Sequence, residues 1–169
     1  MSTSEHDRWK SLTVRRPDDV RTAPGGPVPL TWQMEKLSQH DDRLSNSRLP
    51  VDFPYDIERG DAGDALAALA LRESIRQDIE HGRGGRVHEA MELGATWTEV
   101  AAALAVAPDE ARTLLRQWAS GQHHLYRGDV ERAVDNPLGL SPERHAAVLA
   151  LVELADDERA RPEGKGGAA

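Results

Sequence analysis

The stretch GATWTEVAAALAVAPDEARTLLRQW, Gly94 to Trp118, decides the fold because it holds two short helical patterns separated by a few residues. Thr96 stands three residues before Glu99, which is the spacing of a capping box, so the first helix is expected to begin there. Pro108 suits the first position of a second helix, because its missing N–H is not needed at that point. The stretch therefore predicts two helices joined by a short turn.

The buried faces of these two helices follow from apolar residues at helical spacing. In the first helix they are Trp97, Val100, Ala101 and Leu104, and in the second they are Ala111, Leu114, Leu115 and Trp118. Both sets point into the angle between the helices. We expect the second helix to end at Gly121.

Helical patterns also flank these two helices and their turn, which we call the corner. Residues 64–81 have apolar side chains at helical spacing, and the glycine-rich run 82–85 is predicted to be a hinge before a short helix that ends at Gly94. A weak pattern predicts a short helix over 129–134. Ser141 and Pro142 predict the cap and first turn of a last helix over 142–155. No alternation typical of strands occurs, so the predicted fold is all-α, with a helical domain over 64–158 and its helix-turn-helix at 94–119.

The two ends of the chain are predicted to be mostly disordered or extended. Proline and glycine interrupt residues 1–63 repeatedly, and residues 159–169 are rich in glycine and charge. Within 1–63, the segment 31–44 places Trp32, Met34 and Leu37 where they can form one or two helical turns. Two interpretations stay open. In the first, the segment is a short helix packed on the globular part or a disordered arm with an apolar spot. In the second, it is a motif that docks a partner protein.

Composition limits the classes of function. The formal net charge is −8 and no segment is basic, so the chain as a whole does not attract phosphate. The absence of cysteine excludes disulfides and thiolate chemistry. Neither a signal peptide nor an apolar run of about 20 residues is present, so we expect a cytoplasmic protein with no membrane contact.

The residues Val100-Ala101-x-x-Leu104-Ala105-Val106, followed by Pro108, Ala111 and Leu114, resemble the bacterial helix-turn-helix superfamily, in particular its regulators and region-4-like modules. The resemblance covers 86–119. It implies DNA binding and transcriptional control. The sequence departs from the family at two places: Ala105 stands where glycine is usual in the turn, and Ala107 stands where Ser or Thr usually caps the second helix.

The second helix has side chains suited to DNA on its expected outer face. Arg112 and Arg116 can donate to guanine, Gln117 to adenine, and Thr113 can contact phosphate. Arg83 and Arg86 are expected to contact phosphate beside them. Asp109 and Glu110 oppose this interpretation, because carboxylates at the start of a helix suit its dipole and repel DNA.

Two functions remain open at this point. The favoured hypothesis is a transcriptional regulator that binds double-stranded DNA, with the helix 142–155 as a candidate surface for a homodimer. The alternative is an acidic helical adaptor that binds protein and keeps the helix-turn-helix as a scaffold. His123 and His124 are adjacent and match no metal-site spacing, and no nucleophile motif is present, so we expect no metal, no cofactor and no enzymatic activity.

Overall fold

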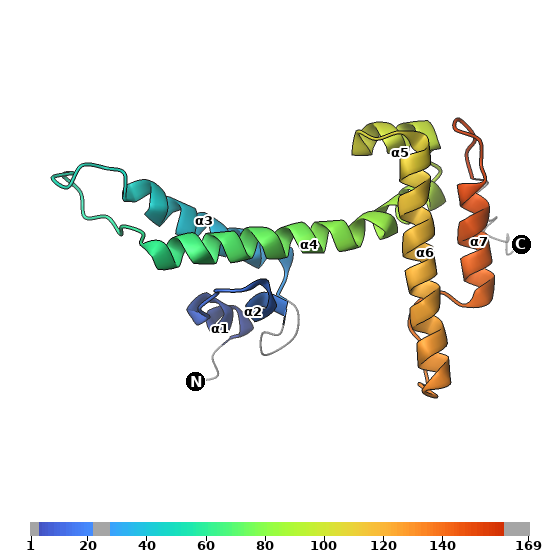
Figure 1. Cartoon of the computed structure of the whole chain (residues 1–169), viewed down its shortest axis with the longest axis horizontal. Coiled ribbons are helices and arrows are strands. Elements are labelled where there is room, and N and C mark those ends of the chain that lie inside the picture. The colour runs from blue at the N-terminus through green and yellow to red at the C-terminus, as the bar shows by residue number, and fades with distance from the viewer. Residues whose placement is uncertain (1–3, 22–27, 161–169) are drawn as a thin grey trace, which may run out of the picture. The chain divides into compact units, whose positions relative to one another are not determined.

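The computed structural model describes residues 4–21 and 28–160, and within them it contains seven helices and no strand (Figure 1), which confirms the all-α prediction. The chain divides into two compact units, residues 1–81 and 82–169. The helices are α1 Glu5–Ser11, α2 Pro17–Arg21, α3 Leu30–Asn46, α4 Ala62–Glu92, α5 Trp97–Leu104, α6 Pro108–Glu131 and α7 Pro142–Val152.

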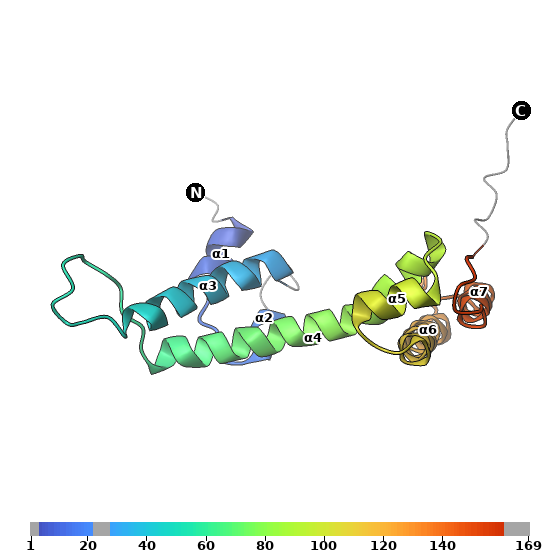
Figure 2. The ribbon, with the colours of Figure 1, turned by 90° about the horizontal axis from the view of Figure 1, so that it is seen from above.

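The N-terminal unit corrects the prediction that residues 1–63 are mostly disordered. Helices α1, α2 and α3 pack with the first part of α4 around a core of Trp9, Val14, Val20, Ala70 and Leu71. The prediction is wrong because two of the prolines in this region stand at the starts of helices and do not interrupt them. Pro17 is the first residue of α2, and Pro29 immediately precedes α3. Figure 2 shows α3 running beside α4.

The C-terminal unit is built around the predicted corner. Trp97 is fully buried between the helices, and its indole N–H donates to the carbonyl of Leu151 at 3.0 Å. The inward faces predicted for α5 and α6 are confirmed at Val100, Ala111 and Leu115, which are all buried. The buried core of this unit comprises Val87, Met91, Trp97, Val100, Ala111, Leu115, Ala119, Leu140, Val148 and Val152.

The glycine-rich run 82–85 does not interrupt the helix as predicted, because α4 spans Ala62–Glu92. A Cβ at position 84 would overlap the Cβ of Trp118 and lie 3.0 Å from the carbonyl oxygen of Leu114. Glycine is therefore needed here for α4 to cross α6 at close range, as in other tight helix crossings. The predicted end of the second helix at Gly121 is also wrong, since α6 continues to Glu131. The first residues of the short helix predicted at 129–134 are therefore part of α6.

The predicted C-terminal helix is shorter than expected, with α7 ending at Val152. Of the predicted disordered tail 159–169, only Arg159 and Ala160 are described, and the remaining residues lie outside the described part of the chain.

The crossing at Gly84 gives the first testable prediction. Gly84→Ala should lower the free energy of unfolding by about 1–3 kcal/mol, because the added methyl group overpacks against Trp118. Gly82→Ala is the matched control, since nothing lies within 4 Å of the position that its methyl group would occupy, and it should raise stability by up to about 1 kcal/mol through helix propensity. Urea unfolding measures both. Equal effects of the two substitutions would contradict the tight crossing.

Candidate functional site

The start of α5 has the predicted capping box. The hydroxyl of Thr96 accepts the N–H of Glu99 at 3.2 Å, and the Glu99 carboxylate accepts the N–H of Thr96 at 2.8 Å. Arg159 donates to the same carboxylate at 2.9 Å. The Thr96 N–H and the Arg159 guanidinium together lower the pKa of Glu99 below its ordinary value. The entry to the corner is thus fixed by polar contacts as well as by Trp97.

The turn between α5 and α6 carries both departures noted in the sequence. Ala105 has φ 54° and ψ 43°, which is the left-handed conformation that glycine usually supplies. Its neighbour Val106 closes the turn by donating its N–H to the carbonyl of Ala101 at 3.1 Å. Ala107, at the N-cap of α6, makes no side-chain hydrogen bond. The corner forms although its sequence is not ideal at either position.

Ala105→Gly should therefore stabilise the protein by about 1 kcal/mol, because glycine adopts positive φ without the steric cost borne by alanine. Ala102→Gly, in the exposed middle of α5, is the matched control and should destabilise by about 0.5–1 kcal/mol. Thermal or urea unfolding distinguishes the two. A loss of stability in both variants would show that Ala105 is not left-handed in solution.

Arg112, the first residue expected to contact DNA, is instead turned into the protein. Its side chain is only 12% exposed. Its Nε donates to the carbonyl of Val152 at 3.2 Å and its Nη2 to the carbonyl of Leu154 at 2.9 Å. The same Nη2 contacts Asp156 at 2.7 Å, and the guanidinium lies over the Trp97 ring at 5.2 Å from its centroid. The Arg112 side chain is thus held by hydrogen bonds to the end of α7 and the residues that follow it.

The other residues expected on the outer face of α6 do not form a cationic surface. Arg116 is half exposed and lies 3.6 Å from Glu153. The hydroxyl of Thr113 donates to the carbonyl of Asp109 at 2.9 Å, and Gln117 is exposed. Asp109 is itself 97% exposed. The face that remains open to solvent therefore begins with a carboxylate.

Arg83 and Arg86 lie on α4 on either side of the crossing glycines. Arg86 is exposed and forms an ion pair with Glu89 at 2.6 Å, three residues along the same helix. Arg83 is half-buried. Because Arg112 is held at the end of α7, the six expected DNA-contacting residues do not form one exposed array.

The three residues of the expected partner-docking segment have different environments. All lie in α3, which is longer than the one or two turns expected. Trp32 and Leu37 pack against the N-terminal core, whereas Met34 is 56% exposed. Met34 and Leu37 also line an open groove of about 400 Å³ with Ile75 and Ile79 of α4. Arg72, Arg76 and Glu80 line the rest of it, and we call the set of four apolar residues the α3–α4 groove.

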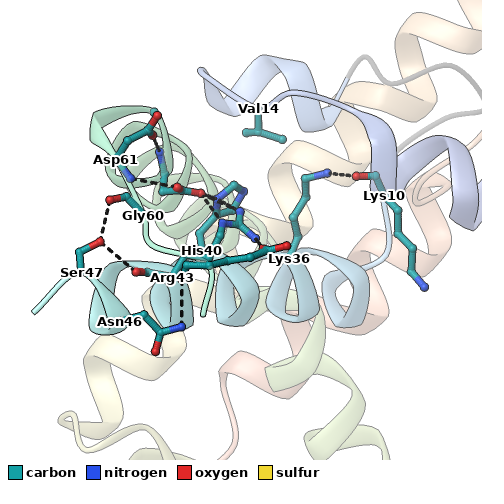
Figure 3. A network of polar contacts seen from close by, with 12 residues as sticks. Lys10, Val14, Lys36, His40, Arg43, Asn46, Ser47, Gly60 and Asp61 are labelled. Carbon is teal, nitrogen blue, oxygen red and sulfur yellow. Dashed lines mark hydrogen bonds and ion pairs between the residues drawn. The ribbon is translucent and has the colours of Figure 1, made fainter. Parts of the chain in front are cut away.

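A polar network in the N-terminal unit was not predicted from the sequence (Figure 3). The Asp64 carboxylate accepts the Nε–H of Arg43 at 2.8 Å and lies 2.7 Å from Nδ1 of His40. Lys36 lies one turn before His40 and is 8% exposed. The spacing of Lys36, His40 and Arg43 places them on one face of α3. That spacing is a usable signal only once the segment is known to be a long helix.

The Asp64 pKa generates a prediction about pH. Hydrogen bonds from Arg43 and then His40 hold this pKa well below its ordinary value of 3.8. The contribution of the Asp64 carboxylate to the free energy of unfolding is therefore complete above pH 3.8. It is lost as the pH falls further, because this carboxylate takes up a proton more readily in the unfolded chain than in the folded one. Asp64→Asn should be less stable than the wild type at pH 6, and the difference in unfolding free energy should shrink below pH 3.8. A difference that stays constant down to acid pH would contradict this assignment.

Comparison with protein-family models, with curated proteins and with solved structures found no match to this chain. Among residues 4–21 and 28–160, no helix is both long and apolar enough to cross a bilayer. The same residues contain no cluster of three or more His, Asp or Glu side chains that could hold a metal ion. The candidate sites therefore rest on geometry alone.

Proposed function

We propose that this chain is an adaptor, a helical module that binds another protein and uses its helix-turn-helix corner as a scaffold. The observation that carries this proposal is the position of Arg112, whose guanidinium is bonded to the carbonyls of Val152 and Leu154. An arginine in that position stabilises the end of α7 and is not available to a base edge. DNA contact through it would require the loss of these hydrogen bonds.

The charge around the start of α6 supports the same proposal. Asp109 and Glu110 occupy the first turn of α6, where they stabilise the positive end of the helix dipole. Asp156, which contacts Arg112, adds a further carboxylate beside this surface. Phosphate groups approaching here would meet exposed negative charge in a chain of net charge −8.

The α3–α4 groove supplies a surface for a protein partner. Met34 and Ile79 are more than half exposed, with 56% and 53% of their surface accessible. The groove runs between two helices that lie side by side (Figure 2), and its aliphatic residues recur at helical spacing on each. Such a groove accepts the apolar stripe of an amphipathic helix, which would complete a three-helix layer. We therefore assign an amphipathic helix of a partner protein as its occupant.

A second candidate function is the DNA-binding regulator favoured by the sequence. It is supported by the corner itself, since α5 and α6 are joined by a short left-handed turn at Ala105 as in helix-turn-helix modules. In that function Thr113, Arg116 and Gln117 would contact DNA, and α7 would be the homodimer surface. The outward side of α7 has small exposed side chains at Ala146, Ala147 and Ala150.

A titration with fluorescent mixed-sequence duplex DNA separates the two functions. At ~20 mM salt, where electrostatic attraction is near its greatest, the adaptor should show no saturable change in anisotropy. Salt-dependent binding that is weakened by Arg86→Ala together with Arg116→Ala, two exposed arginines of the expected DNA-contacting set, would instead establish the DNA-binding function. Paired arginine variants at Arg8 and Arg48, which are exposed in the N-terminal unit, provide the control for loss of two charges.

The protein-binding surface is tested by a photo-crosslinking amino acid placed at position 34, in cells that express the chain. It should give a crosslink to one protein, and Ile79→Asp should abolish that crosslink because it places a charge in the groove. Leu66→Asp is the matched control, since Leu66 is 52% exposed on α4 but does not line the groove. Equal loss with both variants, or crosslinks to nucleic acid, would contradict the proposal.

A further inference from the structure

A polar cavity of about 400 Å³ lies in the N-terminal unit beside the Arg43–Asp64 network. Its walls come from the end of α1 and the residues that follow it, from one face of α3, and from the start of α4. The α3 wall consists of Lys36, His40 and Arg43 together with Gln39. A chain with a net charge of −8 therefore directs a basic face of one helix into a cavity.

Lys36 is the most deeply buried cation of this wall. Its ammonium donates to the carbonyls of Trp9 at 2.8 Å and Lys10 at 2.9 Å, and it lies 4.7 Å from the centroid of the Trp9 ring. An ammonium has three N–H donors, and no described residue accepts the third or provides a carboxylate. Burial and the nearby Arg43 lower the pKa of Lys36. Buried charges are normally paired, so this site lacks a counter-ion.

Arg15, in the segment that follows α1, provides a second cation that lines the cavity. Its Nη1 donates to the carbonyls of Val14 at 2.9 Å and Gly63 at 3.2 Å, which ties the segment after α1 to the start of α4. Its Nη2 occupies the space beside Gly63, where a side-chain methyl group at position 63 would lie 2.9 Å from it. No ion pair joins Arg15 to a carboxylate in the described part of the chain. Arg15 lines the cavity, and its hydrogen bonds to the carbonyls of Val14 and Gly63 both come from Nη1.

The charges around the cavity sum to a positive value. Arg15, Lys36 and Arg43 are opposed by two carboxylates, Asp61 and Asp64. Asp64 is already bonded to Arg43 and His40, and Asp61 accepts the N–H of Asp64 at 3.0 Å. Lys10 also lines the cavity, but its side chain points away from Lys36 (Figure 3).

We propose that this cavity binds a phosphate dianion, free or carried on a small molecule, between Lys36 and Arg15. A guanidinium and an ammonium from different segments of the cavity lining suit a group whose oxygens accept hydrogen bonds in several directions. The cavity is within the size of small-molecule sites, which is roughly 300–1,000 Å³. Binding would supply the counter-ion that Lys36 lacks. This inference concerns a different site from the α3–α4 groove and does not rest on the proposed adaptor function.

Isothermal titration of the full chain with inorganic phosphate, AMP and adenosine tests the proposal, with chloride added to keep the ionic strength constant. Phosphate and AMP should bind saturably, whereas adenosine, which has no phosphate, should not. Arg15→Gln and Lys36→Met should each weaken binding about tenfold or more, as expected for loss of a charge-assisted hydrogen bond. Arg48→Gln removes an exposed cation outside the cavity and should leave the affinity unchanged.

The arms of the titration have distinct meanings. Tighter binding of AMP than of phosphate would identify a phosphorylated small molecule as the ligand, and equal binding would identify free phosphate. Arg15→Gln preserves Lys36 and its contacts with α1, so it gives a result even if Lys36→Met does not fold. Absence of saturable binding by the wild type, or equal weakening by Arg48→Gln and Arg15→Gln, would overturn the proposal.

Discussion

The hydrogen bonds between Arg112 and the end of α7 are the interaction on which the C-terminal unit depends. The carbonyls at the end of a helix have no partner within it, and here the Arg112 guanidinium satisfies those of Val152 and Leu154. The same group lies over Trp97, the largest fully buried side chain of the core. One side chain of α6 therefore contacts both α5 and the segment that follows α7. This position also removes the arginine from the surface on which the sequence placed it.

The same use of cations recurs elsewhere in the molecule. Lys36 donates to two carbonyls at the end of α1, and Arg59 donates to the carbonyls of Asn46, Leu49 and Pro50 in the loop between α3 and α4. In each case a basic side chain donates to main-chain oxygens at a helix end or in a loop, and some of these oxygens, such as that of Trp9, also accept a main-chain N–H. At the expected DNA-binding helix α6, the same use of a cation removes Arg112 from the exposed face.

Much of the fold could be predicted from local sequence. The capping box at Thr96, the Pro108 start of α6 and the buried faces of both helices depend on contacts within a few residues, which periodicity and capping rules describe. The role of the glycines at 82–85 could not be predicted in this way, because it depends on Trp118, more than thirty residues away. Likewise, nothing next to Arg112 in sequence reveals that its partners are the carbonyls of Val152 and Leu154. Predictions failed where the deciding contact was distant in sequence, and at residues 1–63 where helix-starting prolines resembled interruptions.

The most direct test of the position of Arg112 is the NMR signal of its Nε–H group, followed during addition of duplex DNA at low salt. We predict slow exchange with solvent, because this N–H is bonded to the Val152 carbonyl, and a chemical shift that DNA does not change. The Nε–H of Arg86, whose side chain is 82% exposed, serves as the reference for a solvent-facing arginine. Exchange as fast as that of Arg86, together with a shift on DNA addition, would contradict the claim that Arg112 is committed to the protein interior.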